Sequence, residues 1–379
     1  MKSYPRRRSY GSGSVYRTAD GRWRGATTVV DPATGKRTRR TVSGPTAAAT
    51  RGKLEALRAA GTPATTMRTA DWLAAWLPTT RLRVAPSTFH GYESVVRAIG
   101  PHLGDVPLGS LTPSTVERMT AAMVGSGRTA RTAGMARKVL RLALRQAIRD
   151  GLVTRNAAAE SRPPRVEPYQ ARTLTAAEAR HLIATTTDDE HGPLWAVLIA
   201  TGLRQGEALG LAWADVDMDA GTLTVRRSLA RGWDGKPTLG TPKSDRSRRT
   251  IALPGIAREA LDRQRARQAI ARAAAGTAWQ DRDGLVFTDS IGRPLAGRYI
   301  TPALRSALTR AGLPGIRCHD LRHTAATLQL AAGVPLATIS RTLGHSAIAV
   351  TADIYAAVTP ELRREAADAM DRALGGDAS

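Results

Sequence analysis

Residues 14–43 alternate between apolar and polar positions, and turn-forming residues separate the alternating runs. The runs are SVYR, RWRGATTVV and RTRRTV, with Asp20-Gly21 in the first gap and DPATGK in the second. Alternation with this turn chemistry is typical of short strands joined by tight turns. The pattern therefore predicts a small three-stranded sheet. The Ala-rich residues 45–60 that follow predict a helix that covers one face of this sheet.

After this segment the apolar residues recur at helical spacing. Trp72 and Trp76 lie four residues apart, as do Leu73 and Leu77, and residues with this spacing fall on one face of a helix. Three further runs of the same kind follow along the chain. Residues 65–160 therefore predict an independent bundle of about four helices.

Three prolines then interrupt the pattern between Ser161 and Tyr169. Because proline fits neither the interior of a helix nor a central strand, this segment predicts a linker. Beyond it, the capping-box sequence Thr175-Ala-Ala-Glu178 starts a new helix, and two strand-like pieces, TLTVRRS and RRTIAL, follow among helices. The predicted fold class is multidomain α+β, with a sheet-and-helix N-terminal domain (1–62), a helical bundle (65–160), a linker (161–171) and a mainly helical domain with a small antiparallel sheet (172–379).

The charge of the chain indicates a polyanionic partner. The formal net charge is +24 and the sequence pI is about 11.4, an excess that favours nucleic acid. The basic residues extend from Lys2 to Arg372 and do not gather beside a long apolar run, so a membrane partner is not expected. We expect a cytoplasmic protein. Because Cys318 is the only cysteine, an internal disulfide and a cysteine-based zinc site are excluded.

The predicted N-terminal sheet carries many basic residues. One interpretation is that the sheet lies against a DNA groove and binds it through these side chains; the other is that they form a solvated charged surface. The residues concerned are Arg22, Arg24, Arg37, Arg39 and Arg40.

Two short motifs in the last domain place arginines at helix starts. Gly202 ends an apolar helix, and Arg204 and Glu207 then lie three residues apart, a spacing at which the carboxylate can hold the guanidinium and leave other donors free. His319 and Arg322 have the same spacing in the sequence CHDLRHT. Each motif alone is consistent with an ordinary structural pair, but two fixed arginines together can clamp a phosphate.

Two further residues follow these motifs. Gly344 suits the residue after a helix end, which would project His345 from that end. Tyr355 comes ten residues later and is one of seven tyrosines. Cys318, next to His319, is expected to be a buried thiol, and His323 and Tyr299 are expected to pack or to contact the DNA backbone.

The pieces TGLRQGEALGL, HDLRHTAAT, LGHS and IYAAV, taken in this order, resemble the tyrosine site-specific recombinases of the phage integrase family, with actinobacterial-type integrases in particular. The resemblance is strong over residues 172–360. It is weaker over 65–158, which is similar to the SAM-like core-binding domain of that family. It is weakest over 1–60, which is similar to an arm-type DNA-binding domain.

The resemblance implies a division of roles within a reaction that breaks and rejoins DNA without metal, cofactor or ATP. It assigns Glu207 to a supporting role. Only six of the 56 basic residues are lysines, so a lysine at the position where the family has one is informative. The resemblance assigns Lys243 to this position, and Lys236 is the alternative. The implied catalytic residues are Tyr355 as the nucleophile that forms a 3′-phosphotyrosyl link, Arg204, Arg322 and His345 at the phosphate oxygens, His319 in proton transfer, and Lys243 as the acid for the leaving oxygen.

The same resemblance implies the partners. These are double-stranded DNA attachment sites of a mobile element that is integrated or excised, a homotetramer on that DNA, and accessory proteins for directionality and DNA bending. It also implies a DNA contact at Thr88, association with the nucleoid, and a terminal helix after Thr359-Pro360 that docks on a neighbouring protomer or packs on its own domain. Two alternatives are a type IB topoisomerase-like relaxation enzyme and a DNA-binding regulator that does not use its catalytic residues.

Overall fold

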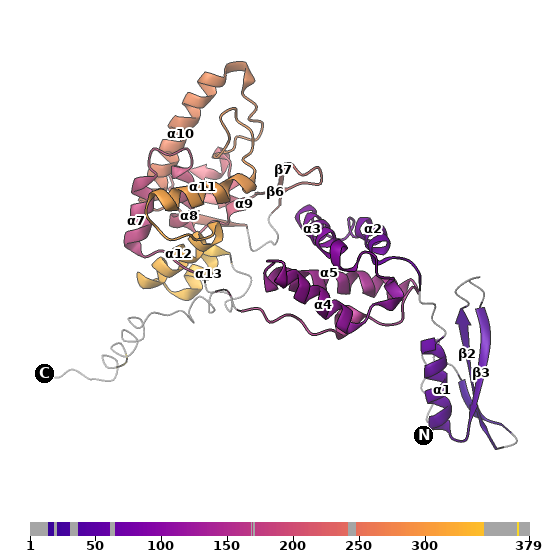
Figure 1. Cartoon of the computed structure of the whole chain (residues 1–379). Helices are drawn as coiled ribbons and strands as arrows, with labels where there is room; N and C mark the ends of the chain where they lie inside the picture. Colours follow the sequence, from indigo (N-terminus) through magenta and orange to yellow (C-terminus); the bar gives the residue numbers. More distant parts are fainter. Residues whose placement is uncertain are drawn as a thin grey trace, which may run out of the picture. The chain divides into compact units, whose positions relative to one another are not determined.

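The computed structural model describes residues 14–18, 21–30, 37–60, 65–167, 169, 171–241, 248–344 and 370 (Figure 1). The chain divides into two compact units, residues 1–168 and 169–379, and each is described by itself. The α+β fold class predicted from the sequence is confirmed, with a three-stranded sheet near the N-terminus, a helical bundle, and a mainly helical second unit that holds small antiparallel sheets.

The N-terminal sheet is antiparallel in the order β1-β2-β3. Its strands are β1 (Ser14–Arg17), β2 (Trp23–Val30) and β3 (Arg37–Gly44), and α1 (Ala47–Ala60) follows. Leu54 of α1 lies directly against Gly25 of β2, so α1 covers the face of the sheet that Gly25 shares with its cross-strand partner Val42. The predicted sheet with its covering helix is confirmed.

The helical bundle follows in the same unit. Its helices are α2 (Thr69–Thr79), α3 (Pro86–Leu103), α4 (Pro113–Gly125), α5 (Ala130–Arg149) and the short α6 (Ala157–Glu160), with a 3₁₀ turn, η1 (Leu108–Ser110). The side chains of Thr112 and Thr129 accept a hydrogen bond from the third residue of α4 and of α5, respectively, which begins each helix. In the core, the indole Nε1 of Trp72 donates to the Ala143 carbonyl at 3.2 Å.

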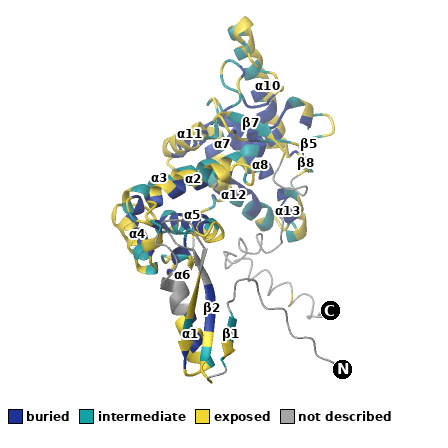
Figure 2. Cartoon of the chain, turned by 90° about the vertical axis from the view of Figure 1, so that its right-hand side faces the viewer, coloured by how far each residue is buried: buried dark blue, intermediate teal, exposed yellow. Residues whose placement is uncertain are grey.

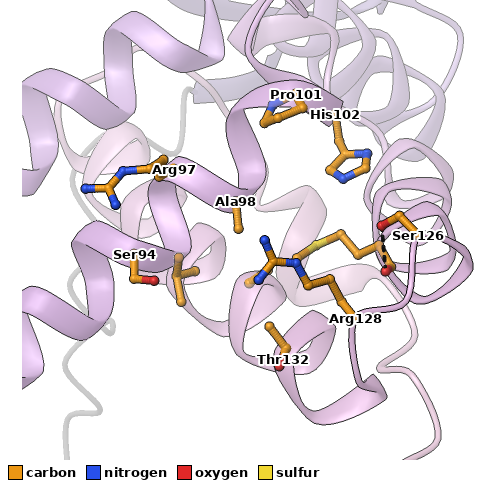
Figure 3. Close-up of a pocket in the computed structure, with 11 residues that line it drawn as sticks. Ser94, Arg97, Ala98, Pro101, His102, Ser126, Arg128 and Thr132 are labelled. Carbon is orange, nitrogen blue, oxygen red and sulfur yellow. Dashed lines mark hydrogen bonds between the residues drawn. The ribbon is translucent and has the colours of Figure 1, made fainter. Parts of the chain in front are cut away.

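A cavity of about 460 Å³ lies between α3, α4 and the start of α5. Figure 3 shows His102 from α3 and Arg128 from the turn before α5 at its border. The other lining residues are partly apolar, such as Met123 and Ala136, and partly polar, such as Ser94 and Thr132.

The second unit begins with a helix that its sequence marks clearly. Thr175 Oγ1 accepts from the Glu178 N–H at 3.2 Å and Glu178 Oε2 accepts from the Thr175 N–H at 2.8 Å, so the predicted capping box is confirmed. The helices of the unit are α7 (Ala176–Thr185), α8 (Gly192–Thr201), α9 (Gln205–Leu209), α10 (Gly255–Ala275), α11 (Gly297–Arg310), α12 (Cys318–Ala331) and α13 (Leu336–Leu343), with 3₁₀ turns η2 (Trp213–Asp215) and η4 (Gly276–Ala278).

In the described part of the second unit, the strands form two small antiparallel sheets. The predicted pieces TLTV and RTIA are β5 (Thr222–Val225) and β8 (Arg249–Ala252), which pair directly in a sheet of order β4-β5-β8. Three strands were not predicted: β4 (Val216–Asp217), β6 (Ser228–Arg231) and β7 (Pro237–Gly240), of which the last two form a hairpin. These strands are short and lack apolar alternation, so local sequence gives little signal for them.

The core of the second unit is built around α8. Residues 192–199 are all buried, and α8 packs against α10 and α12, so the sequence PLWAVLIAT is apolar on every side because neighbours surround it. Figure 2 shows the buried residues in dark blue and the exposed end of α10 in yellow. Across the part of the chain that the structure describes, no helix combines the length and apolar character of a membrane span.

Candidate active site

Arg204 stands at a sharp change of direction between α8 and α9. Gly202 ends α8 with φ +65°, a left-handed conformation that favours glycine, and any Cβ there would collide with Leu343 of α13. The chain then restarts with Arg204 as the N-cap residue of α9. Gly202 therefore places Arg204 and also lets the end of α13 approach.

Glu207 holds Arg204 from the first turn of α9. Its Oε1 accepts from Arg204 Nη1 at 2.7 Å, and its Oε2 accepts from the Arg204 backbone N–H at 3.0 Å. A second guanidinium, that of Arg249, donates to both oxygens at 3.2 and 2.8 Å. Burial alone would raise the pKa of Glu207, but a hydrogen bond and the charge of Arg249, together with hydrogen bonds from Arg204, hold the pKa below its ordinary value. The carboxylate is therefore anionic.

Arg322 lies in the first turns of α12 and is only 3% exposed. Its Nη1 donates to the Gly202 carbonyl at 2.7 Å, and its Nη2 donates to the Leu343 carbonyl at 2.6 Å. Burial, and next the positive charge of Arg204, lower the pKa of Arg322 to about 9. The side chain stays cationic at neutral pH, and two cations thus share one site.

His319 lies one turn before Arg322 on α12, at the surface of the unit. Its ring meets the ring of His323 edge-on, with centroids 5.1 Å apart. Partial burial, then the charges of His323 and Arg322, lower the pKa of His319, while Asp320 opposes them. At neutral pH the imidazole is therefore neutral and can accept a proton.

The C-terminal end of α13 meets three arginines. Gly344 caps this helix with φ +66°, as predicted. Arg249 Nε donates to the Thr342 carbonyl at 2.6 Å, and Arg204 Nη2 donates to the Gly344 carbonyl at 3.1 Å. Together with the bond from Arg322 to Leu343, three successive carbonyls at this helix end each accept from a different arginine, which suits the negative end of a helix dipole.

A tyrosine anchors the start of α12. Tyr169 Oη donates to Asp320 Oδ2 at 2.7 Å, and the same oxygen accepts from the Arg317 backbone N–H at 2.8 Å. The Arg317 guanidinium lies 3.5 Å from the centroid of the Tyr169 ring. These contacts fix the helix turn that carries His319. The adjoining Cys318 is buried as expected, and burial with the charge of Asp320 raises the pKa of its thiol to about 12.

The structure brings together four of the predicted site residues: Arg204, Glu207, His319 and Arg322. Lys243, His345 and Tyr355 lie outside the described residues, as does the terminal helix predicted after Thr359-Pro360. The alternative lysine, Lys236, is exposed in the turn between β6 and β7. The roles of all these residues stay predictions. In the described ranges no three His, Cys, Asp or Glu side chains are grouped so that they could hold a metal ion.

The predicted DNA-binding residues are exposed where their side chains are described. These are Arg22, Arg24, Arg39 and Arg40 of the sheet region, and Thr88 at the start of α3. The register divides the arginines: Arg39 opposes Thr28, on the face that Arg24 shares, whereas Arg40 opposes Thr27, on the face toward α1. The side chain of Arg37 lies outside the described residues. One face of the sheet therefore cannot present all five arginines.

The sequence did not single out Arg249, Asp320 or Tyr169. Arg249 is one of many arginines, and its partners, Glu207 and Thr342, lie 42 and 93 residues away. Asp320 stood within a quoted motif, but its hydrogen bond to Tyr169 spans 151 residues. A local pattern gives no signal for contacts at such separations.

Two parts of the chain match domains of one protein family. Residues 172–361 match the phage integrase family, and residues 70–123 match the N-terminal SAM-like domain of phage integrases. Among similar proteins, an integrase from Streptomyces ambofaciens is 31% identical over 75% of this chain and 74% of its own. A tyrosine recombinase XerC-like protein from Caldanaerobacter subterraneus is 27% identical over 79% of this chain and 82% of its own.

Solved structures share the fold. The Tn1549 transposon integrase, in complex with transposon right end DNA, superposes with a TM-score of 0.66 at 21% identity, over 82% of this chain and all of that chain. A lambda integrase tetramer bound to a Holliday junction gives a TM-score of 0.59 at 20% identity, over 92% of this chain and 96% of that one.

Proposed function

Since this chain belongs to the phage integrase family and is a site-specific DNA recombinase, we propose that its site residues divide the reaction among them, with Tyr355 as the nucleophile. The observation that carries this proposal is that Arg204 and Arg322 both donate to carbonyls at the end of α13, with His319 one turn before Arg322 on α12. The residue after that helix end is His345, and Tyr355 follows ten residues later.

The proposed reaction exchanges one phosphoester for another. The Tyr355 oxygen attacks the scissile phosphorus, a 3′-phosphotyrosyl bond forms, and the bond to the 5′-oxygen breaks. A 5′-hydroxyl from a second strand then attacks the phosphotyrosine and restores the DNA backbone. Because the energy of the phosphodiester is conserved in the covalent intermediate, rejoining requires no ATP.

Arg204, Arg322 and His345 are proposed to bind the non-bridging oxygens of the phosphate. Negative charge grows on these oxygens in the transition state, and donors that are already in place stabilise it at little cost of reorganisation. Each of the two arginines donates some of its five N–H groups to backbone carbonyls, which fix the plane of the guanidinium. The other N–H groups remain available to bind the phosphate.

Two residues are proposed to move protons. His319, neutral at pH 7 because of its lowered pKa, would accept the proton of Tyr355. Lys243 would give a proton to the leaving 5′-oxygen, with Lys236 as the alternative donor. A lysine suits this role because, unlike arginine, it can lose its proton at accessible pH.

The remaining parts of the chain are proposed to bind DNA. We assign residues 1–62 to an arm-type domain that binds through Arg24 and Arg39, 65–160 to a core-binding domain with Thr88 at the DNA, and 172–379 to catalysis, joined by the linker 161–171. The partners are double-stranded attachment sites of a mobile element, on which four copies assemble, with directionality and bending proteins. The place of action is the nucleoid. The similar lambda and Tn1549 integrases have been solved on DNA.

The test replaces Tyr355 by Phe. Duplexes from the DNA that flanks the gene serve as substrates, one of them nicked beside the cleavage point so that the covalent adduct accumulates. We expect Tyr355→Phe to bind DNA like the natural protein and to form no adduct, whereas Tyr299→Phe, at an exposed tyrosine, still forms the adduct. Cleavage by Tyr355→Phe would refute the assignment. Fast relaxation of plasmids without any attachment site would instead support the topoisomerase alternative, which the similarity to integrases does not favour.

A further inference from the structure

We propose that Arg249 is a positioning residue of this site, which holds Arg204 through Glu207 and ties both to the end of α13. The inference rests on the proposed function, because it assumes that Arg204 contacts the scissile phosphate. It adds a residue from β8 to a site whose other members come from the start of α9, the chain between β7 and β8, α12 and the chain after α13.

The first support is the geometry at Glu207. Both carboxylate oxygens are shared: Oε1 accepts from the Nη1 atoms of Arg204 and Arg249, and Oε2 accepts from the Arg204 N–H and from Arg249 Nη2. The side chains of Arg249 and Glu207 are 7% and 3% exposed, whereas that of Arg204 is 37% exposed. The buried pair is thus the fixed support, and Arg204 is the part that reaches the surface.

The second support is the bond from Arg249 to α13. Its Nε donates to the Thr342 carbonyl at 2.6 Å, next to the carbonyls that Arg322 and Arg204 bind. Arg249 itself is held in the sheet, where it pairs with Val225 of β5. One guanidinium therefore connects a strand to the two elements that position Arg204 and lead to His345, and rigid elements place site residues more accurately than loops do.

Loss of Arg249 has a predictable consequence. Glu207 would remain buried with one cation in place of two, and a buried carboxylate with fewer partners either draws its remaining cation closer or takes up a proton. Both outcomes change where Arg204 points. Lysine cannot replace Arg249 fully, since one ammonium cannot span both carboxylate oxygens and the Thr342 carbonyl as the planar guanidinium does.

The test measures adduct formation in a single turnover at saturating DNA, with full-length protein. We expect Arg249→Gln to slow this step by about 10²-fold, the size typical of a misplaced catalytic group, and Arg249→Lys to slow it less, with DNA affinity unchanged. The matched control is Arg293→Gln, which breaks an exposed pair with Asp289 whose atoms are also 2.8 Å apart, and it should react at the natural rate.

Two readouts separate positioning from general damage to the fold. A methylphosphonate at the scissile position has one charged oxygen fewer than the phosphate, so its transition state depends less on the charge of Arg204. Arg249→Gln should therefore slow adduct formation less on the methylphosphonate than on the phosphate. In addition, Glu207→Gln with Arg249→Gln should be no slower than the slower single variant, because both act through the same group. If Arg249→Gln does not fold, Arg249→Lys is compared on the two substrates.

Three results would overturn the inference: a natural rate for Arg249→Gln, equal losses on phosphate and methylphosphonate, or additive losses in the double variant. Absence of any adduct with the natural protein would be a different failure. It would refute the proposed function rather than the role of Arg249.

Discussion

The helical bundle and the second unit bury different kinds of side chain. In the described part of the first unit, the buried polar residues are threonines and one serine, and none is charged. The second unit buries Glu207, Asp215, Asp320 and Arg322. Because a buried charge is costly unless it is paired, such residues are poor choices for stability alone. Packing therefore explains the buried positions of the bundle. In the second unit, by contrast, three of the four buried charges, Glu207, Asp320 and Arg322, belong to the candidate active site.

Each of these four buried charges has a partner on another part of the chain. Arg322 binds carbonyls at the ends of α8 and α13, and Asp320 binds Tyr169. Asp215, away from the site, pairs with Arg227 at 3.0 Å. The bundle joins its helices mainly by apolar contact, and the second unit joins α8, α9, α12 and α13 by charged groups as well. Substitutions in the two units should accordingly have different effects.

The largest expected effect is that of Arg322→Ala on the chemical step. Loss of a preorganised donor at the phosphate should slow adduct formation by about 10²–10³-fold, and the carbonyls of Gly202 and Leu343 lose their partner. The rate is measured in a single turnover with saturating DNA, and folding by thermal denaturation. A rate within threefold of the natural protein would remove Arg322 from the clamp.

Leu140→Ala should have the opposite profile. Leu140 is fully buried in the bundle, so its truncation should lower the free energy of unfolding by about 2–5 kcal/mol, while DNA-bound protein that remains folded forms the adduct at the natural rate. Denaturant titration and the single-turnover assay measure the two quantities. Leu82→Ala, at a position that is 98% exposed, is the matched control without effect on either. A large loss of rate in folded Leu140→Ala would contradict the division between the units.

The pH dependence tests His319 as the base. Its pKa lies below the ordinary value of about 6.5, so it is neutral at pH 7 and becomes protonated only in acid. Adduct formation should fall as the pH drops through the lowered pKa of His319, by about tenfold per pH unit below it. Protonation also costs stability in the same direction, since the unfolded state binds the proton more readily.

The control for this profile is the neighbouring histidine. Partial burial also lowers the pKa of His323, but it has no proposed part in catalysis. His323→Gln should keep the acid limb of the rate, and His319→Gln should lose it together with most of the rate. An acid limb that disappears in His323→Gln alone would reassign the base.

The smallest expected effect is that of Tyr169→Phe. It removes one hydrogen bond to Asp320, and the Arg317 N–H still binds the same oxygen, so the loss of stability should be about 1 kcal/mol. The difference is measured by denaturant titration near neutral pH. The bond to Asp320 raises the pKa of Tyr169, so this stability is present below the ordinary tyrosine pKa and is lost as the pH rises through the raised one. A gain of stability would show that Tyr169 does not anchor α12.

Features set by neighbours in the sequence were predictable. The capping box at Thr175, the glycine ends of α8 and α13, and the pair of Arg204 with Glu207 each depend on residues within a few positions. The bundle was predictable because its buried residues repeat at helical spacing. The order of the site residues along the chain indicated their family before any distance was known.

Features that depend on tertiary contacts were not predictable. Arg249 reaches Glu207 and Thr342 only because β8 lies beside α9 and α13 in the folded unit. The hairpin of β6 and β7, with Pro237 at the start of β7 and Gly240 at its end, has no alternation to mark it. The same holds for the division of the sheet arginines between two faces, since the register of β2 and β3 decides it.

The most direct test of the account is to locate the covalent link. The protein is trapped on a nicked substrate, digested with trypsin and nuclease, and the nucleotide-bearing peptide is identified by mass spectrometry. The account predicts the peptide of residues 342–363, whose one tyrosine is Tyr355, with the nucleotide attached through its 3′-phosphate. A link at any other tyrosine, or through a 5′-phosphate, would contradict it.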